Sequence, residues 1–407
     1  MKWIATREAG LEQLHSYAEH MGRYYAARRN HDEGPPRRNV SQLSPWLHAG
    51  LISEREVLQT ALSRHSSSSA DKFISEVFWR IYFKGYLEQR PTIWAAYCDD
   101  RDDAIRAMRG NSGKAKAYER AISGGTGIEA FDYWAKELVE TGYLHNHARM
   151  WFASLWIFTL KLDWTLGADF FLRHLMDADA ASNTLSWRWV GGLHTKGKTY
   201  LARASNIASY TADHEEGPLR AEGLSAEAEP LSEHHEHSRR PIVLPDRTDA
   251  HKDGQPYALL LHDEAAHHAP LGLVEPPALV ISALRPDARS PEPVGELALQ
   301  FSKQAVHSGA DAASVDFGCQ HVDWAPERSL GAILDKAGLS RVITSYLPVG
   351  WTRDALAPDL RPLRDEGRLI ELVSDLDHAT WPHAKAGFFG VKKIMGDAMH
   401  EAGIAPA

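Results

Sequence analysis

Apolar residues recur at spacings of three and four through the first half of the chain. The period is clear over residues 72–88, 128–141 and 147–160, where polar residues fill the positions between. A period near 3.6 matches one face of an α-helix, and the prolines and glycines between these stretches are typical of turns. The pattern therefore predicts a mostly helical domain over residues 1–210.

This apolar period is lost after residue 210. From there to about residue 255 the sequence is rich in Glu, His, Ser and Pro and follows neither a helical nor an alternating pattern. Such a composition favours a linker or a long surface excursion. Residues 211–255 are therefore expected to connect two domains.

Short apolar runs alternate with helical patterns beyond residue 255. This alternation predicts a parallel sheet with crossover helices, so residues 256–407 are expected to form a Rossmann-like α/β domain. The expected strands lie at residues 258–261, 278–284, 313–322, 341–346 and 368–373. The expected helices lie near residues 294–307, 327–337 and 353–365.

Length and composition support this two-domain organisation. A chain of 407 residues exceeds the size at which one hydrophobic core usually stops growing.

The start, MKWIATREAG, lacks the apolar segment of a secretory signal, and the longest apolar run covers only residues 150–160. A spanning helix needs ~20 apolar residues. The expected location is the cytoplasm, with no membrane partner.

The cysteine and histidine content limits the chemistry. Cys98 and Cys319 are the two cysteines of the chain, which excludes a disulfide framework and a four-cysteine iron–sulfur cluster. Any redox chemistry of this chain therefore needs an organic cofactor. The histidine-rich patches at residues 234–237 and 267–268 lack the spacing of a tetrahedral metal site, so no metal is expected.

Charge is distributed unevenly along the chain. Residues 1–210 carry 27 Lys and Arg against 23 Asp and Glu, although the whole chain has a net charge of −9. An acidic protein is a poor general candidate for nucleic-acid binding. The positive first half nevertheless leaves room for a local surface that faces phosphates.

Three segments of the first half place polar and aromatic side chains on one face. In DADAASNTLSWRW, at 177–189, Asp179, Asn183 and Trp187 follow one another at spacings of four. A carboxylate, an amide and an indole on one helical face are too polar for plain core unless a group with hydrogen-bonding edges lies against them. HNHARM at 145–150 and EVFWRIYF at 76–83 have the same mixed character.

These motifs, in this order, resemble the photolyase and cryptochrome family. That family carries an HNRxRM-like segment, an apolar helix, a DW pair and a DxDxAxNxxxWxW-like segment, matched here by residues 145–150, Asp163 with Trp164, and 177–189. SQLSPWLHAG at 41–50 is similar to the family's flavin-phosphate loop, and EVFWRIYF to its ExxWREFY helix. The similarity covers about residues 15–206, and five ordered motifs are far more specific than one.

The resemblance implies an all-helical, photolyase-type FAD-binding domain. Arg149 would pair with Asp177 beside the isoalloxazine ring, Asp179 would accept a hydrogen bond from the ring edge, and Asn183 would face flavin N5. An amide can hydrogen-bond N5 but cannot readily give it a proton. The other implied FAD contacts are Tyr25, near the adenine–ribose end, the phosphate-loop residues Ser41, Gln42, Leu43 and Ser44, and Arg80.

The resemblance also implies DNA as the partner and a cyclobutane pyrimidine dimer as the substrate. The dimer pocket would be lined by Glu76, Trp79, Met150 and Trp189, because a flipped base pair must be stacked on indole and held by a polar group. From spacing alone, Glu76 with Arg80 could be a solvated helix pair and the indoles could be core. The implied DNA contacts are Asn146, His147, which replaces the family's usual Arg, Lys196, Lys198 and Arg203.

The implied activity is repair of such dimers by electron transfer from excited reduced FAD. The alternative is a cryptochrome-like photoreceptor without repair turnover, and a third possibility is a flavin-binding relic without photochemistry. Trp187 and Trp164 match the first two members of the family's tryptophan chain. The third position falls on Ala121, so Tyr118 or Trp134 could substitute, or electrons could leave by another route.

The expected α/β domain carries a weaker resemblance. LSRVITSYLPVGWTRDAL at 339–356 is similar to a strand–turn–helix of the family's antenna domain, and residues 258–273 faintly resemble its first strand and loop. In photolyases the antenna domain precedes the flavin domain. We therefore expect an antenna-like domain in swapped order, which is tolerable where termini lie close together at the surface. No pattern selects a second chromophore or a protein partner.

Overall fold

The computed structural model describes residues 3–245 and 250–404. Residues 1–2, 246–249 and 405–407, which include a small part of the expected linker, lie outside the described residues. Three parts of the described chain carry its α-helices and strands around hydrophobic cores, and residues 211–256 connect the first two. We call the three parts the helical half (residues 3–210), the α/β half (residues 257–374) and the C-terminal segment (residues 375–404).

The helical half confirms the helical period. The predicted helices at residues 72–88, 128–141 and 147–160 correspond to α5, α8 and α9, the last continued by a π-helical turn at Leu155–Thr159. The helices are α1 (Arg7–Tyr17), α2 (Arg23–Arg28), α3 (Ser44–His48), α4 (Glu54–Arg64), α5 (Ser67–Glu88), α6 (Thr92–Arg109), α7 (Ser112–Ile122), α8 (Glu129–Thr141), α9 (Asn146–Ser154), α10 (Trp164–His174), α11 (Ala180–Val190) and α12 (Ala204–Tyr210).

Local signals fix where these helices begin and end. Ser53 and Glu56 form a capping box at the start of α4, in which each side chain accepts a hydrogen bond from the other residue's backbone N–H. Gly142 ends α8 with a left-handed backbone (φ 66°), which costs glycine little. The Asp179 side chain caps α11. The two aspartates of the 177–179 segment therefore sit just before a helix start.

The α/β half is a five-stranded parallel sheet in the order β3-β2-β1-β4-β5. Its strands are β1 (Ala258–His262), β2 (Leu279–Ala283), β3 (Gln320–Asp323), β4 (Val342–Ser345) and β5 (Leu369–Leu372). Its helices are α13 (Glu296–Phe317), α14 (Leu330–Lys336) and α15 (Trp351–Asp365). The expected order, a helical domain followed by a Rossmann-like α/β unit, is confirmed.

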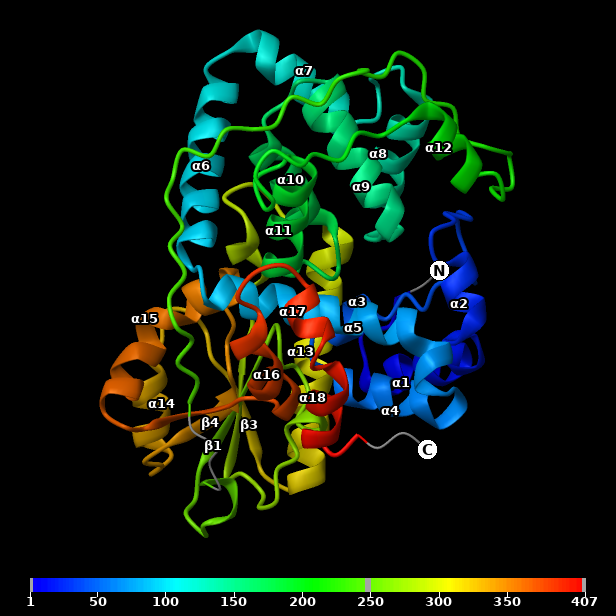
Figure 1. Ribbon diagram of the computed structural model, residues 1–407. Helices are drawn as coiled ribbons and strands as arrows, with labels where there is room; N and C mark the ends of the chain where they lie inside the picture. The colour runs from blue at the N-terminus through cyan, green and yellow to red at the C-terminus, as the bar shows by residue number, and fades with distance from the viewer. Residues whose placement is uncertain (1–2, 246–249, 405–407) are drawn as a thin grey trace.

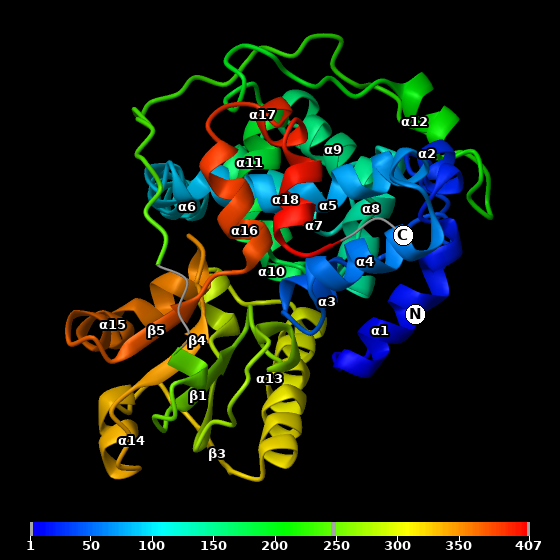
Figure 2. The same cartoon turned by 60° about the horizontal axis from the view of Figure 1, so that its bottom comes forward.

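Helices cover both faces of this sheet (Figure 2). Leu260 of β1 belongs to the hydrophobic cluster formed with α14 and α15. Its neighbours Leu259 and Leu261 belong to the cluster formed with α13. Successive side chains of a strand point to opposite faces, so a run of apolar residues such as 258–261 is what a strand covered on both sides requires.

One expected strand is wrong in most of its length. Residues 313–322 were expected as a strand, but α13 continues to Phe317 and ends at Gly318 with φ 64°, and β3 begins only at Gln320. The helical spacing of the buried residues along this segment decides the outcome, because it places Phe301 and Ala305 against the core of the helical half and Ala313 against the sheet. β3 itself is a short edge strand that is incompletely buried.

The segment 211–245 runs across the surface of the helical half from α12 towards α6 (Figure 1). Backbone hydrogen bonds tie it down: Ala130 N–H donates to the carbonyl of Arg220 (2.9 Å), Leu231 N–H to that of Gly191 (2.9 Å), and Arg240 N–H to that of Gln89 (2.8 Å). This part of the expected linker is a surface excursion attached to the helices.

The C-terminal segment returns to the helical half. Its helices are α16 (Asp375–Thr380), α17 (Phe389–Lys392) and α18 (Met395–Glu401). The first two lie beside α5, and α18 packs against α16 (Figures 1 and 2). Leu376, Trp381 and Phe388 join the hydrophobic cluster of α4 and α5. A Cβ on Gly85 would lie 2.6 Å from the Trp381 ring. The structure thus differs from the expected boundary, because residues 375–404 pack with the first domain.

Within the described residues, no helix is both long and apolar enough to cross a membrane. The same residues contain no group of three His, Cys, Asp or Glu side chains placed to hold a metal ion.

Asp377 of α16 makes the docking of the C-terminal segment sensitive to pH. Burial and the charge of Glu54 raise the pKa of Asp377 to about 6, against the opposing effect of Lys84. Because the folded pKa exceeds the unfolded one, this group's stabilisation is complete at low pH and is lost as pH rises through about 6.

We predict that Asp377→Asn raises the free energy of unfolding at pH 8 by about 1–2 kcal/mol and changes it little at pH 4. Urea denaturation across this range measures the difference. Asp311→Asn is the control, since the Asp311 side chain is 79% exposed. Equal pH profiles for Asp377→Asn and the wild type would contradict the assignment.

Candidate active site

A partly buried ion pair joins α9 to the turn before α11. Arg149 Nη1 and Nη2 donate to Asp177 Oδ1 and Oδ2 at 3.2 and 2.8 Å. Arg149 Nε donates to the carbonyl of Leu144 at 3.0 Å, which orients the guanidinium plane. This two-point geometry is more specific than a single contact and fixes both side chains.

Electrostatics keep Asp177 ionised. Burial alone would raise its pKa, but the attraction and hydrogen bonds of Arg149, the Ser44 hydroxyl and nearby His48 hold the pKa of Asp177 below its usual value. Ser44 and His48 are the first and last residues of α3. The predicted pairing of Arg149 with Asp177 is therefore present, and the first residue of α3 brings a hydroxyl to it.

Asp179 forms the second carboxylate of the site. It accepts a hydrogen bond from Ser182 N–H (2.7 Å). Its Oδ2 lies 3.3 Å from Arg80 Nη1, 3.8 Å from His48 Nδ1 and 3.9 Å from Lys84 Nζ. Burial opposes ionisation, but the charge of Arg80, a hydrogen bond from His48 and the charge of Lys84 hold the pKa of Asp179 far below its usual range.

Asn183 lies one turn further along α11. Its Nδ2 donates to the carbonyl of Ala168 at 2.9 Å, and among the described residues no donor is hydrogen-bonded to its Oδ1. Trp187, one more turn along, is 2% exposed. The helix predicted from the spacing of Asp179, Asn183 and Trp187 is present, with Asn183 and Trp187 one turn apart on α11 and Asp179 at its N-cap.

The polar atoms of this site suit the edge of a flavin ring. Both ring nitrogens of His48 and the Nη2 of Arg80 are buried without a hydrogen-bond partner in the part of the chain described. Buried polar atoms are normally paired. A heteroaromatic group that carries negative charge when reduced would meet donors from His48 and Arg80 beside the fixed cation Arg149. The residues present therefore fit FAD.

The side chains of Gln42 and Leu43 in the expected phosphate loop make internal contacts. Gln42 Nε2 donates to the carbonyls of Pro36 (3.0 Å) and Arg37 (3.2 Å). Leu43 is 2% exposed and belongs to the core. The carbonyl of Ser41 accepts from Gln13 Nε2 at 2.9 Å. Of these four residues, Ser44 is the one whose side chain the structure places at the Asp177 cluster.

The expected dimer-pocket residues lie on three helices. On α5, burial raises the pKa of Glu76, although the charges of Arg29 and Lys72 act in the opposite direction. The pKa of Tyr25 on α2 is also raised, mainly by burial and secondly by the charge of Glu76. Tyr25 packs edge-on against Phe73 with ring centroids 5.1 Å apart.

The two expected pocket indoles have different neighbours. Trp79 stacks on Phe388 of the C-terminal segment, with centroids 4.1 Å apart and an interplanar angle of 12°. Trp189 of α11 stacks on Tyr200 at 5.6 Å. Met150 follows Arg149 on α9 and is half-buried. No ring contact joins Trp79 to Trp189 within the described residues.

An unpredicted indole lies beside Trp187. The Trp156 ring is T-shaped to Trp187 at 6.2 Å and to Tyr118 at 6.0 Å. Trp164 instead contacts Tyr97 at 5.7 Å. Trp134 stacks on Trp151 at 5.4 Å, and Ala121 is fully buried. Trp156 was missed because its apolar run, 150–160, is indistinguishable from plain core.

Four of the five expected DNA contacts are exposed and one is not. Asn146, Lys196, Lys198 and Arg203 are exposed. The ring of His147 stacks on Trp151 at 4.4 Å, its Nδ1 lies 2.9 Å from the carbonyl oxygen of Asn30, and burial lowers its pKa. The side chain of His147 is therefore committed to internal contacts.

The sequence analysis missed two further members of the site. His48 follows Ser44 by four residues, and Lys84 follows Arg80 by four. The spacing of four places each on the same helical face as a predicted residue, so the signal was present. Lys84 also lies 3.6 Å from Glu264 of the α/β half, a contact that the pattern of one helix cannot reveal.

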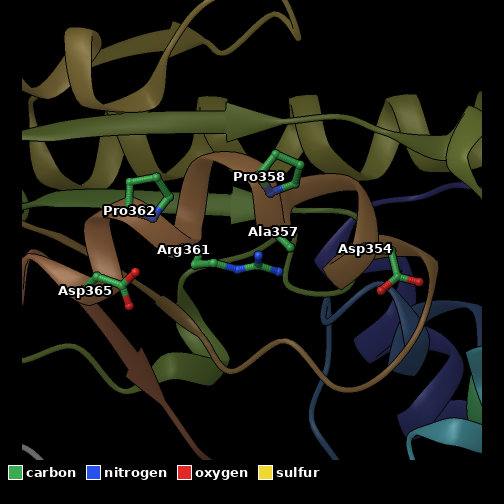
Figure 3. Close-up of a pocket in the computed structure, with 6 residues that line it drawn as sticks. All are labelled: Asp354, Ala357, Pro358, Arg361, Pro362 and Asp365. Carbon is green, nitrogen blue, oxygen red and sulfur yellow. The ribbon is translucent and has the colours of Figure 1, made fainter.

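A groove of about 430 Å³ follows α15 but does not gather convergent side chains. Figure 3 shows Asp354 and Asp365 at opposite ends of the helix with Arg361 between them. Asp354 accepts a hydrogen bond from Trp94 Nε1 at 2.7 Å. The lining comes from one helix, so the groove lacks the convergent polar groups of a ligand site.

Comparison with known proteins finds a family match that begins within α5 and ends just after α12. Residues 73–217 match the family described as the FAD binding domain of DNA photolyase. The deoxyribodipyrimidine photo-lyase of Streptomyces griseus is 35% identical over 157 residues, 38% of this chain and 33% of that protein. Tyr25 and residues 41–44 lie outside the family match.

Two further relatives show similar coverage. The deoxyribodipyrimidine photo-lyase of Agrobacterium fabrum is 33% identical over 196 residues (47% of this chain, 39% of that protein). Cryptochrome DASH of Idiomarina loihiensis is 30% identical over 197 residues (46% and 41%). The chain thus spans less than half the length of these curated relatives.

Among solved structures, a bacterial class III photolyase from Agrobacterium tumefaciens matches with 27% identity and a TM-score of 0.42. The match covers 50% of this chain and 42% of that protein.

We predict that Asp177→Asn costs roughly 2–4 kcal/mol of unfolding free energy, because it leaves Arg149 with a largely buried, uncompensated charge. Chemical denaturation of the unliganded protein measures this loss. Glu129→Gln is the control, since it removes the partner of Arg220 in a pair whose side chains are 44% and 75% exposed. A loss no larger than that of the control would show that the pair does not organise the site.

Proposed function

We propose, on the premise that residues 73–217 belong to the FAD-binding domain family of DNA photolyases, that the chain binds FAD and uses blue light to repair cyclobutane pyrimidine dimers in DNA. The observation that supports this most strongly is the partly buried, two-point Arg149–Asp177 pair, together with Asn183, whose Oδ1 lacks a hydrogen-bond partner within the described residues. All three residues lie inside the matched segment. Curated relatives of this segment are named deoxyribodipyrimidine photo-lyase.

Each residue of the flavin site has a distinct task. Bound reduced FAD would supply the light-excited electron that opens the cyclobutane ring and is then returned. Arg149 compensates negative charge beside the ring system, and Asp177 keeps the guanidinium from being unpaired. Asn183 presents its amide oxygen to a ring-edge donor and, as an amide, has no acidic proton to give.

Substrate recognition would fall to Glu76, Trp79, Met150 and Trp189. Because burial raises its pKa, Glu76 keeps its proton to a higher pH than an exposed glutamate. A protonated carboxyl can donate a hydrogen bond to a dimer carbonyl and favour the added negative charge. Trp79 and Trp189 would stack on the flipped bases. The exposed Asn146, Lys196, Lys198 and Arg203 would contact DNA phosphates.

A second candidate function is a cryptochrome-like photoreceptor, and the Trp79–Phe388 stack favours it. Phe388 covers an indole expected to stack on a flipped base (4.1 Å between centroids). The C-terminal segment is held there by Tyr82 OH, which donates to the carbonyl of Ala386 at 2.6 Å, and by Gln89 Nε2, which donates to that of Trp381 at 2.8 Å. A photoreceptor that binds no dimer has no need to expose the Trp79 ring, so it could keep this stack.

We predict that Glu76→Ala lowers the repair rate of a dimer-bearing single-stranded oligonucleotide by at least about tenfold while leaving bound flavin unchanged, because it removes one donor to the developing charge. Illumination of the reduced protein, with product analysis and flavin content in parallel, measures both. Glu140→Ala, at an exposed position of α8, is the control. Ejection of the flavin by Glu76→Ala would show that the role given to Glu76 is incorrect.

We also predict that Phe388→Ala strengthens binding of the same oligonucleotide by at least about threefold, because base stacking on an exposed aromatic ring contributes ~1–3 kcal/mol. Fluorescence anisotropy measures the affinity. The matched control is Phe389→Ala, which changes the next residue, whose side chain is 78% exposed. No binding by the wild type or by Phe388→Ala, and no repair in light, would decide for the photoreceptor.

A further inference from the structure

The segment that carries both site aspartates, residues 175–180, is held by the α/β half. Arg289 Nη1 donates to the carbonyl of Leu175 at 3.1 Å. Trp351 Nε1 donates to the carbonyl of Ala178 at 2.9 Å. These two carbonyls flank Asp177 in sequence. Two side chains from a different part of the fold therefore form hydrogen bonds to the backbone on either side of Asp177, the residue that pairs with Arg149.

Both donors are buried and support one another. Arg289 and Trp351 are each 1% exposed. The Arg289 guanidinium lies over the Trp351 ring, 5.0 Å from its centroid, and Arg289 Nη2 donates to Ser302 Oγ at 2.6 Å. A side chain locked by such contacts loses little conformational freedom when it donates its hydrogen bond, so it fixes the position of the acceptor.

The origin of the two donors explains their rigidity. Arg289 ends the short helical turn Pro286–Arg289 after β2, and Trp351 begins α15 after β4. The loop before Trp351 is anchored to the end of α5, where Glu88 accepts hydrogen bonds from Tyr346 OH (3.0 Å) and from Val349 N–H (2.5 Å). Arg353 also pairs with Glu88.

Close backbone contact completes the arrangement. A Cβ on Gly350 would lie 2.8 Å from the Cβ of Ala180, which leaves no space for a larger residue between the β4–α15 loop and the start of α11. The loop and the aspartate segment therefore approach as one packed unit. A shift of the α/β half would carry residues 175–180 with it.

From these contacts we infer that Arg289 and Trp351 are positioning residues for Asp177 and Asp179, so that the α/β half completes the FAD site structurally. This inference rests on the proposed function only in naming FAD as the ligand. Its physical basis is that a buried carbonyl deprived of its donor must find another partner or move. A displacement of the segment by about 1 Å would break the two-point geometry of the Arg149 pair.

Arg289 also adds a positive charge behind the site. Burial lowers its pKa to about 10, against the opposing attraction of Asp263, Asp177 and Glu264. At neutral pH the group is thus protonated. The guanidinium charge contributes to the field around Asp177, in addition to the hydrogen bond that Arg289 donates to Leu175.

The test compares Trp351→Phe with a matched tryptophan in the same half. Trp324 is 2% exposed, and its Nε1 donates to the carbonyl of Arg328 at 2.7 Å, a local contact away from residues 175–180. Each substitution keeps an aromatic ring and removes one N–H donor. The readouts are the Kd for reduced FAD under anaerobic conditions and hydrogen exchange of the amides of residues 176–180 in the unliganded protein.

We predict that Trp351→Phe weakens FAD binding by about tenfold, equivalent to roughly 1.4 kcal/mol, and speeds exchange of those amides, whereas Trp324→Phe changes neither. Arg289→Lys is a second variant, expected to act in the same direction because it keeps the charge but loses the planar donor fork. If Trp351→Phe does not fold, the same two measurements on Arg289→Lys test the inference.

The outcomes separate this inference from the proposed function. If wild-type protein binds no FAD, the proposed function fails, while hydrogen exchange still decides the positioning role. If Trp351→Phe and Arg289→Lys match Trp324→Phe in both readouts, the positioning role is overturned although FAD binding stands.

Discussion

Asp177 and Arg149 hold one another in the interior, and the arrangement around them follows from the cost of burying charge. A buried carboxylate needs a partner with several donors, and the guanidinium satisfies both oxygens at once. Placing the two groups requires that α9 and the turn before α11 meet at a fixed distance. The pair therefore constrains the packing of two helices as well as the chemistry of the site.

The need to pair buried charge also involves other parts of the chain. Asp179 is surrounded by Arg80, His48 and Lys84, and Lys84 extends the charge network to Glu264 of the α/β half. On the other side, Trp351 and Arg289 reach the backbone around Asp177. The site thus lies where two architectures meet, and its polar groups are shared between them. A flavin bound here would depend on both.

The sequence predicted the parts of this site that repeat along one helix. Spacings of four predicted the helix that carries Asn183 and Trp187 behind its N-cap Asp179, and the alternation of strands and helices predicted the sheet. The prediction missed contacts made between elements: the stack of Phe388 on Trp79 and the bond of Trp351 to Ala178 join residues more than a hundred positions apart. Local periodicity contains no information on such pairs.

Boundaries were predicted less well than element types, for a related reason. The expected strand at 313–322 is mostly the end of α13, because the buried face of that helix extends through Ala313. The C-terminal segment contains apolar residues that suit either domain, and their burial against α5 decides the outcome. In both places tertiary packing selects between structures that the sequence pattern allows equally.

The most direct test of the account is a crystal structure of the protein reconstituted with FAD. The account predicts the isoalloxazine ring beside the Arg149–Asp177 pair, with the Asn183 amide within hydrogen-bond distance of its edge. A flavin bound elsewhere, or crystals of reconstituted protein without flavin in which these three side chains face separate spaces, would contradict it.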